Sequence, residues 1–381
     1  MYCGFGESKY TTIIFISYLC GHLKFKKYDK KMETVVSGIR PTGNLHLGNY
    51  FGAVKSFLQM QNEYNCFFFI ADWHSLTTHP HPENIRRSVK TILAEYLACG
   101  IDPEKATIYI QSDVRQIAEL YLYLNMNAGI GELMRTASFK EKARKQLHVN
   151  QGESDNDVEK EIFNESNKHS VSAGLLTYPT LMAADIIIHK AVKVPVGKDQ
   201  EQNMEMARRF ARRFNATYGV DCFPEPASFH LADKAVKVPG LDGSGKMGKS
   251  EGNAIYLVDD EKTIRKKVMK AVTDAGPTEP NSVKPEPVAN LFTMMEIVSS
   301  KDAYDYFNEK YNACEIRYGD MKKQLAEDIN LFCAPIRERI LDMMADEEYL
   351  TRVARIGAEK ASESAAKTLR EVREIIGFRA E

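Results

Sequence analysis

The fold is decided by the stretch Ser37-Gly38-Ile39-Arg40-Pro41-Thr42-Gly43-Asn44-Leu45-His46-Leu47-Gly48-Asn49-Tyr50. The β-branched run 33–36 precedes it, and residues 51–58 after it place apolar side chains at helical spacing. A strand, a glycine-rich turn and a helix in this order are typical of a parallel sheet, where helix-terminal N–H groups can bind a phosphate. The turn has neither the GxGxxG spacing of a dinucleotide site nor the lysine ending of a P-loop. Taken alone, it is equally well an ordinary strand–helix connection with a surface histidine.

Strands and helices alternate along the chain as far as residue 112. Residues 66–72 form a continuous apolar run that ends in an acid, as buried parallel strands do. Residues 82–100 carry apolar side chains on one helical face and end in glycine, and residues 106–112 form the next strand. The pattern predicts a doubly wound, Rossmann-type α/β domain with a parallel sheet.

Strand character is weaker beyond this point. We expect helices over 115–126, 131–143 and 178–188, and a long amphipathic helix over about 199–218. Residues 145–170 are polar and acid-rich, so we expect a surface loop that is disordered without ligand.

The C-terminal part is predicted to be all-helical, because no segment past Tyr256 has strand periodicity. The expected helices cover residues 261–272, 289–298, 303–312, 314–332, 335–344, 350–366 and 369–376. We therefore expect a Rossmann-type domain over 32–262, with a helical insertion at about 115–190, and a helical domain over 263–381.

The first 31 residues differ from the rest of the chain. Residues 11–19 form an apolar run that is too short to span a bilayer, and most of the positive charge follows it, at Lys24, Lys26, Lys27, Lys30 and Lys31. A secretory signal has the opposite order, and a mitochondrial presequence is rich in arginine, which residues 1–31 lack. We interpret residues 1–31 as a translated upstream extension, with Met32 as the working start.

Composition narrows the class of protein. The 381 residues are 44% apolar and 27% charged, which is typical of a soluble globular protein. The 51 basic and 52 acidic residues balance, so nucleic acid would have to be bound through local patches. The seven scattered cysteines form no CxxC pair, which argues against a disulfide framework or a metal cluster and suits a reducing cytoplasm.

A second motif lies two hundred residues after the first, at Pro239-Gly240-Leu241-Asp242-Gly243-Ser244-Gly245-Lys246-Met247-Gly248-Lys249-Ser250. Its glycines make the backbone flexible, and its two lysines make it cationic, so the loop can close on a polyphosphate. Most Gly/Lys/Ser stretches are solvated surface loops, and that reading stays open for this segment alone.

The two motifs together resemble the paired signatures of class I aminoacyl-tRNA synthetases. Within that class, the chain from about Val35 onwards is similar to the tryptophanyl-tRNA synthetase family. Three further stretches carry this resemblance: 37–43 with 48–53, 176–186 and 195–200. Asn49 stands where many class I enzymes have a second histidine, and Gly248 stands where serine is usual. The second departure is expected to loosen the loop without disabling it, since both lysines remain.

The resemblance implies that ATP lies across the carboxyl ends of the parallel strands. The implied catalytic residues are His46, Asn49, Lys246, Lys249 and Ser250. The implied ATP contacts are Arg40, Pro41, Thr42, Gly48, Asn49, Gly197, Lys198, Asp199, Val238, Lys246, Met247, Gly248, Lys249 and Ser250. Arg40, Thr42 and the N–H groups near Gly48 and Asn49 would hold the phosphates. The two lysines would bind the leaving pyrophosphate as its charge develops.

The resemblance also implies a tryptophan pocket, formed by Asp185, Met182, Tyr178, Gln200, His74 and Val36. The indole has one polar handle, an N–H donor, which a buried Asp185 carboxylate would accept. Leaving that carboxylate unpaired costs roughly 1–3 kcal/mol, which discriminates against a phenylalanine ring. Met182 lies one turn earlier on the same face, Gln200 would hold the substrate ammonium group, and His74 equally suits a structural role.

The implied activity is ATP-dependent ligation of L-tryptophan to tRNA(Trp) by a cytoplasmic homodimer, with no membrane and no DNA partner. Mg²⁺ is expected to bind through phosphate oxygens and water, without a metal site made by the protein. The helical C-terminal part would bind the anticodon stem, whereas the cluster of Arg208, Arg209, Arg212 and Arg213 is better explained as a mixed exposed face.

Three alternatives remain. A tyrosyl-tRNA synthetase shares the fold and both signatures, although its phenol pocket typically uses a tyrosine–aspartate pair. A non-catalytic, synthetase-like tRNA-binding protein would tend to lose one signature, and this chain keeps both. A generic nucleotidyltransferase is disfavoured by the long helical C-terminal part.

Overall fold

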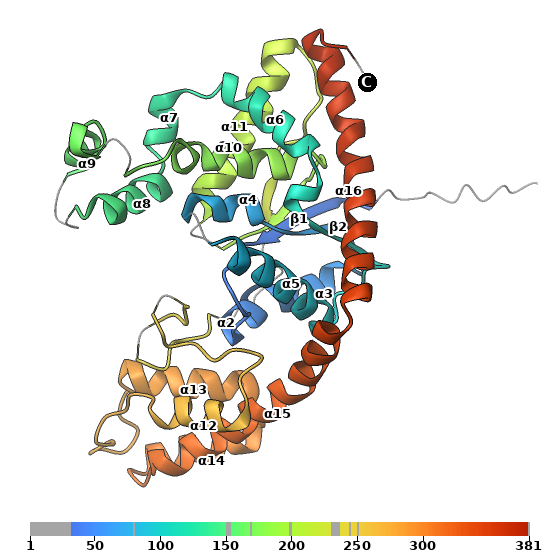
Figure 1. Cartoon of the computed structure of the whole chain (residues 1–381). Helices are drawn as coiled ribbons and strands as arrows, with labels where there is room; N and C mark the ends of the chain where they lie inside the picture. The colour runs from blue at the N-terminus through green and yellow to red at the C-terminus, as the bar shows by residue number, and fades with distance from the viewer. Residues whose placement is uncertain are drawn as a thin grey trace, which may run out of the picture. The chain divides into compact units, whose positions relative to one another are not determined.

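A five-stranded parallel sheet forms the centre of the computed structural model, which describes residues 32–78, 81–149, 154–167, 170–197, 200–229, 237–243, 245–249 and 251–379 (Figure 1). The strands are β1 Thr34–Ile39, β2 Asn65–Ile70, β3 Ala106–Ile110, β4 Lys193–Pro195 and β5 Ala227–Phe229. They lie in the order β3-β2-β1-β4-β5, and each neighbouring pair is parallel. Strands β1 to β3 are added towards one edge of the sheet, and β4 and β5 are then added on the other side of β1. This change of winding direction confirms the predicted doubly wound fold.

The first helical segments follow β1 and β2. They are α2 Leu47–Asn49, a π turn Tyr50–Val54, α3 Lys55–Met60, α4 Asp72–Ser75 and α5 Pro82–Cys99. The middle of the chain contains α6 Gln116–Met126, α7 Ile130–Met134, α8 Ala137–Leu147, α9 Asp155–Ile162, α10 Ala173–Ile187 and α11 Glu201–Tyr218. The C-terminal helices are α12 Glu261–Met269, α13 Glu286–Val298, α14 Lys301–Asn312, α15 Tyr318–Ala345 and α16 Glu347–Ile376.

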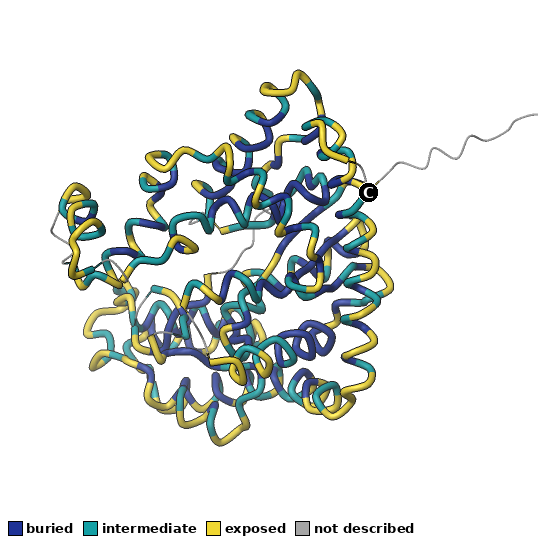
Figure 2. The backbone as a smooth tube through the Cα atoms, turned by 45° about the horizontal axis from the view of Figure 1, so that its top comes forward, coloured by how far each residue is buried: buried dark blue, intermediate teal, exposed yellow. Residues whose placement is uncertain are grey.

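The sheet separates two apolar cores, because successive side chains of a strand point to opposite faces. Val35 and Phe68 lie in the core that α3, α5 and α12–α15 complete. Val36 and Phe67 lie in the other core, which α6, α10, α11 and α16 complete. Figure 2 shows the buried segments in the interior of the described part of the chain and the exposed residues on its outer helices.

The predicted loop over 145–170 is wrong in part, because it contains the helix α9. Ser154 and Asp157 form a capping box at its N-terminus, and Asp155 pairs with Lys140 and Arg144 of α8 at 2.5 and 2.8 Å. Val158 is buried in a small cluster with Phe139. Because these contacts involve another helix, the composition of the segment did not reveal them. The expected disorder of this segment stays a prediction.

Two pairs of predicted C-terminal helices are in fact continuous. Pro335 lies inside α15, where Cys333 and Ile336 on either side of it are buried in the same core. Likewise, α16 runs through residues 367–368 with Ala365 and Leu369 buried together. Packing of an unbroken apolar face thus outweighs the local breaks that the sequence suggested. In the opposite sense, the helix expected over 131–143 is divided into α7 and α8.

The described part of the chain has no helix with the length and apolar character needed to cross a bilayer. Its cysteines, Cys66, Cys99, Cys222, Cys314 and Cys333, are free thiols. Residues 1–31, interpreted above as an upstream extension, lie outside the described residues.

The edge strand β3 is covered by α16, which lies alongside it (Figure 1). Gly357 makes this approach possible, since a Cβ at that position would lie 1.7 Å from the backbone oxygen of Ile108. Covering an edge strand removes a template for pairing with other chains. The glycine therefore determines how closely the C-terminal helix packs on the sheet.

We expect Gly357→Ala to lower the free energy of unfolding by about 1–3 kcal/mol, because the methyl group overpacks a backbone contact. Urea denaturation followed by circular dichroism measures this change. Gly319→Ala is the matched control, since a Cβ there meets nothing within 4 Å. It should be neutral or stabilise α15 by about 0.5–1 kcal/mol. Equal stability of the two variants would contradict the role given to Gly357.

Candidate active site

The histidine and asparagine of the first motif form a reciprocal cap at the start of α2. His46 donates its backbone N–H to Asn49 Oδ1 at 3.2 Å, and the Asn49 N–H donates to His46 Nδ1 at 3.3 Å. A reciprocal cap of this kind joins the N-cap residue to the third residue of the helix, which explains why His46 and Asn49 stand three apart. A Cβ at Gly48 would lie 2.9 Å from the His46 ring, which explains the glycine between them. The Asn49 N–H, expected to face a phosphate, is thus already used within the turn.

The turn after β1 pairs with a distant segment that follows the lysine loop. Leu47 donates its N–H to the Ile255 carbonyl at 3.0 Å, and Leu257 donates to the Leu45 carbonyl at 2.9 Å. Lys249 Nζ donates to the Gly43 carbonyl at 2.8 Å, across 206 residues of sequence. The two motifs predicted to act together therefore lie side by side at the carboxyl end of β1.

Asn253 anchors the lysine loop, and sequence reasoning missed it. Its side-chain amide donates to Asp242 at 2.9 Å and to the Lys246 carbonyl at 3.2 Å, and its oxygen accepts the Gly248 N–H at 2.9 Å. Met247 is buried and donates its N–H to the buried Val238. These contacts fix the backbone of the loop at residues 246–248, between the two lysines. The Lys246 side chain is exposed.

Two groups of basic residues influence one another: Arg40 with Lys142, and His46 with Lys246 and Lys249. Burial lowers the pKa of Arg40, of Lys142 and of Lys249, and Arg40 lowers that of Lys142 further. Burial, followed by the charges of Lys249 and Lys246, lowers the pKa of His46 to about 4. Positive groups that depress one another's charged forms are stabilised by an anion placed between them. These residues therefore form a candidate polyanion site.

Lys142 was also missed by sequence reasoning. Its Nζ lies 4.2 Å from the centroid of the Tyr178 ring, so α8 places a charge beside the predicted tryptophan pocket. The only signal in the sequence was the basic run 140–145, which reads as a solvated helix face. Which way the Lys142 side chain points depends on how α8 packs.

Asp185 forms a closed network with residues from two other elements. Its side chain has 0% exposure on α10, and it accepts hydrogen bonds from Gln111 Nε2 at 2.8 and 2.9 Å. Gln111 thus reaches both carboxylate oxygens, and His74 Nε2 lies 2.8 Å from Oδ2. Burial raises the pKa of the Asp185 carboxyl, and the His74 and Gln111 contacts oppose that shift. The predicted buried acceptor is thus present, and its oxygens retain lone pairs for a further donor.

Gln111 was missed, although its position offered a signal. It is fully buried and directly follows β3, at the sheet edge where ligands of doubly wound folds bind. Its amide oxygen accepts the Trp73 N–H at 3.1 Å, which directs its NH₂ group towards Asp185. Gln111 follows β3 as Asp72 follows β2, and this position directly after a buried strand was the signal in the sequence.

The remaining pocket residues surround this network. The Tyr178 hydroxyl accepts a hydrogen bond from Asn203, which also donates to Gln200 Oε1 at 2.8 Å. The His74 and Tyr178 rings meet edge to face at 5.9 Å. Val36 is fully buried below the site, and Met182 is half-buried on the face of α10.

The other predicted ATP contacts are distributed unevenly. Pro41 is buried, Thr42 is exposed beside Lys249, and Gly197 is exposed and accepts the Gln200 N–H at 3.0 Å. Lys198, Asp199 and Ser250 lie outside the described residues.

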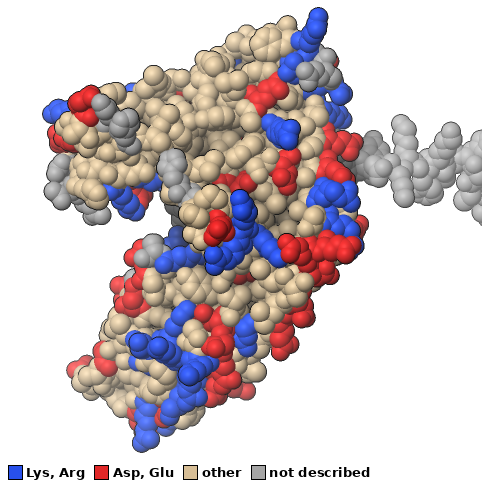
Figure 3. All heavy atoms as spheres, viewed as in Figure 1, with Lys and Arg blue, Asp and Glu red and all other residues tan. Residues whose placement is uncertain are grey.

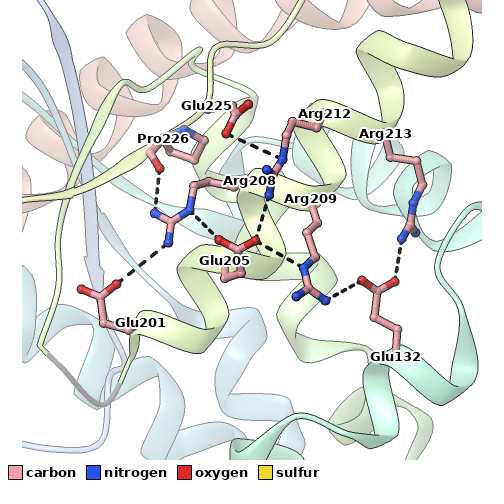
Figure 4. A network of polar contacts seen from close by, with 9 residues as sticks. All are labelled: Glu132, Glu201, Glu205, Arg208, Arg209, Arg212, Arg213, Glu225 and Pro226. Atoms are coloured by element: carbon pink, nitrogen blue, oxygen red, sulfur yellow. Dashed lines mark hydrogen bonds and ion pairs between the residues drawn. The ribbon is translucent and has the colours of Figure 1, made fainter.

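The arginine cluster of α11 is paired with acids, as predicted for a mixed face (Figure 4). Glu205 accepts from Arg208, Arg209 and Arg212, and Glu132 of α7 accepts from Arg213 at 2.7 Å. Glu201 and Glu225 complete the ion pairs. This network connects α11 to α7 and to the segment before β5, and its charges are largely compensated.

The model of the family tRNA synthetases class I (W and Y) matches residues 28–334. This chain belongs to that family. Within it, the chain is 73% identical to a tryptophan–tRNA ligase from Porphyromonas gingivalis, with 91% of this chain and 100% of that protein covered. A tryptophan–tRNA ligase from Listeria monocytogenes is 40% identical over 91% of this chain and 98% of that protein.

Solved synthetase structures agree with the fold. The tryptophanyl-tRNA synthetase from Campylobacter jejuni, complexed with ADP and tryptophan, superposes with a TM-score of 0.77. It is 32% identical, and the match covers 91% of this chain and all of that one. Among the described residues of this synthetase chain, no three His, Cys, Asp or Glu side chains are placed to hold a metal ion.

We expect the His46 imidazole to titrate with a midpoint near pH 4, so that it is neutral at pH 6. Two-dimensional NMR of histidine ring signals measures the midpoint, and loss of one signal in His46→Gln assigns it. Adding inorganic pyrophosphate should raise the midpoint, because the anion offsets the charges of Lys246 and Lys249. A midpoint near 6.5 that pyrophosphate does not move would contradict the polyanion site.

Proposed function

We propose that the chain activates L-tryptophan with ATP and transfers it to tRNA(Trp), as a tryptophan–tRNA ligase. The observation that carries this proposal is the 73% identity to a tryptophan–tRNA ligase over that protein's full length. ATP, tryptophan and tRNA are accordingly its substrates.

The activation step needs no nucleophile from the protein. The tryptophan carboxylate attacks the α-phosphorus of ATP, and the bond to the β-phosphate oxygen breaks to release pyrophosphate. Arg40, Lys142, Lys246 and Lys249 are the cations of the candidate site and would stabilise the negative charge that develops on the leaving group. Such groups accelerate the reaction only to the extent that they bind the transition state more tightly than ATP.

His46, Asn49 and Ser250 complete the proposed catalytic set. His46 accepts at Nδ1 and is neutral, so its Nε2–H is available as a donor to a phosphate oxygen without adding charge. Asn49 holds the imidazole in that orientation. Mg²⁺ would enter with ATP, bound by phosphate oxygens and water, since the side chains around the proposed phosphate site are mainly cationic.

Asp185 is proposed to select tryptophan by accepting the indole N–H. Gln111 and His74 orient its carboxylate, so little reorganisation is needed on binding. The ring would pack against Met182, Tyr178 and Val36. Gln200 would accept a hydrogen bond from the substrate ammonium group. A ring without a donor forgoes this further hydrogen bond to the carboxylate, which should weaken its binding relative to indole by roughly 1–3 kcal/mol.

The helical region 263–381, with α12 at its border, is proposed to bind the tRNA anticodon stem. Figure 3 shows Lys and Arg gathered where Figure 1 places α12. This helix exposes Lys262, Arg265, Lys266 and Lys270, whose charges would contact phosphates. The ion-paired arginines of α11 are a poorer candidate. A cytoplasmic location fits these substrates.

We expect ATP–pyrophosphate exchange to depend on tryptophan and not on tyrosine. Labelled pyrophosphate appearing in ATP measures the reaction with each amino acid separately. Exchange with tyrosine alone would assign the chain to the tyrosyl enzymes, which share the fold.

In the same assay, Lys249→Ala should lower the exchange rate by about 10²–10³, because one donor to the developing charge is lost. Lys262→Ala on α12 is the matched control and should leave exchange unchanged. Full exchange by Lys249→Ala would favour a protein whose lysine loop has no catalytic role.

The chain is also proposed to form a homodimer through α6 and α7. Leu122, Met126 and Ile130 are 48%, 75% and 66% exposed, a group of apolar side chains that suggests an interface. Light scattering after size exclusion should give twice the chain mass. Met126→Asp should give a monomer, whereas Leu331→Asp, at a 72% exposed site on α15, should remain dimeric. A monomeric wild-type chain would refute this interface.

A further inference from the structure

Glu95 is a buried carboxylic acid directly below the ATP side of the site. It lies on α5 with 0% exposure, and its Oε2 accepts the Leu45 N–H at 2.8 Å. Its other oxygen, Oε1, has no hydrogen-bond partner among the described residues. The residue stands in the run Leu93-Ala94-Glu95-Tyr96-Leu97, where the other side chains are buried and apolar or aromatic.

A buried carboxyl with one unpaired oxygen costs free energy, because that oxygen has lost water without gaining a partner. Burial raises the pKa of the Glu95 carboxyl to about 8, and the Leu45 N–H and the charge of Lys249 oppose that shift. At neutral pH the group is therefore mainly protonated. A proton at this position exchanges close to physiological pH.

The position of Glu95 links both motifs of the ATP site. Leu45 immediately precedes His46, and the same turn receives the Lys249 ammonium at the Gly43 carbonyl, 2.8 Å away. Lys249 and Glu95 act on each other electrostatically, as do Glu95 and Cys99. The other titratable groups nearby are His46 on the turn, Tyr96 on α5, and Cys333 and Arg339 of α15 beyond Cys99.

We propose that Glu95 is a positioning residue that supports the Gly43–His46 turn and takes up a proton when ATP binds, which releases Lys249 towards the phosphates. While Glu95 is ionised, its charge holds the Lys249 ammonium at the turn. The polyphosphate attracts that ammonium and disfavours a nearby carboxylate, so a proton from solvent neutralises Glu95. This inference rests on the proposed ATP site and adds a linkage between ATP binding and pH.

Calorimetry of ATP binding tests the proton uptake directly. ATP without amino acid is titrated at pH 8 in two buffers of different ionisation enthalpy, and the difference gives the protons taken up. A carboxyl with a pKa of about 8 is half ionised there, so we expect uptake of up to about half a proton. Glu95→Gln keeps an acceptor for the Leu45 N–H but cannot titrate, so this uptake should disappear. Glu83→Gln, at an exposed site of the same helix, should behave as wild type.

The pH profile provides a second measurement. The KM for ATP in pyrophosphate exchange should rise above pH 8 in the wild type by several-fold more than in Glu95→Gln. Glu95→Leu should weaken ATP binding at every pH, because the Leu45 N–H loses its acceptor. Equal proton uptake and parallel profiles in wild type and Glu95→Gln would overturn the inference while leaving ATP binding intact. Failure of the wild type to bind ATP would instead refute the proposed function.

Stability gives a readout that needs no ligand. Because the folded-state pKa lies above that of the unfolded chain, wild-type stability falls as pH rises from about 4.5 to about 8. Glu95→Gln lacks this term, so its melting temperature relative to the wild type should increase from pH 5 to pH 8. Should Glu95→Gln not fold, infrared difference spectra of the wild type at pH 8 decide the matter. Absence of a new protonated-carboxyl band on ATP binding would then overturn the inference.

Discussion

The contact between Lys249 Nζ and the Gly43 carbonyl, 2.8 Å apart, is the interaction on which the site depends. It joins residues that are 206 positions apart in the sequence. Closing such a long loop costs conformational entropy, so the contact is stable only together with other contacts between the same segments. The backbone bonds of residues 45–47 with residues 255–257 provide that support. Everything between the two motifs, including the pocket helix α10, is therefore folded around one junction at the carboxyl end of β1.

The site has opposite charges at its two ends. Arg40 and Lys249 are desolvated beside the turn after β1, whereas Asp185 is desolvated on α10. Burying a charge is unfavourable unless it gains partners. Asp185 has its partners within the protein, and the cations have their best partner in a polyanion.

Sequence reasoning recovered those features whose signal is local. The strand pattern of residues 66–72, the His46–Asn49 spacing and the buried acid at Asp185 each follow from neighbouring residues, and the structure contains all three. It missed Asn253, whose partners lie within 11 residues, and Gln111, which is marked only by its place directly after β3. It missed Lys142 and Glu95 because each becomes significant only through a contact with a distant segment. The helix α9 was missed for the same reason, since its stability comes partly from ion pairs with α8.

The sequence by itself determined the parallel α/β class, the two motifs and the family to which they point. Periodicity, glycine positions and residue spacing are properties of a short stretch of chain, and they survive without knowledge of the rest. Only the tertiary structure decided which partner each polar group has. Asp185 and Gln111 are 74 residues apart, and Lys249 and Gly43 are 206 residues apart, so no local pattern connects either pair. The meeting of Asp185 and Gln111 depends on the order β3-β2-β1-β4-β5 and on how α10 packs against it, because a buried polar group is stable only where the fold supplies its complement.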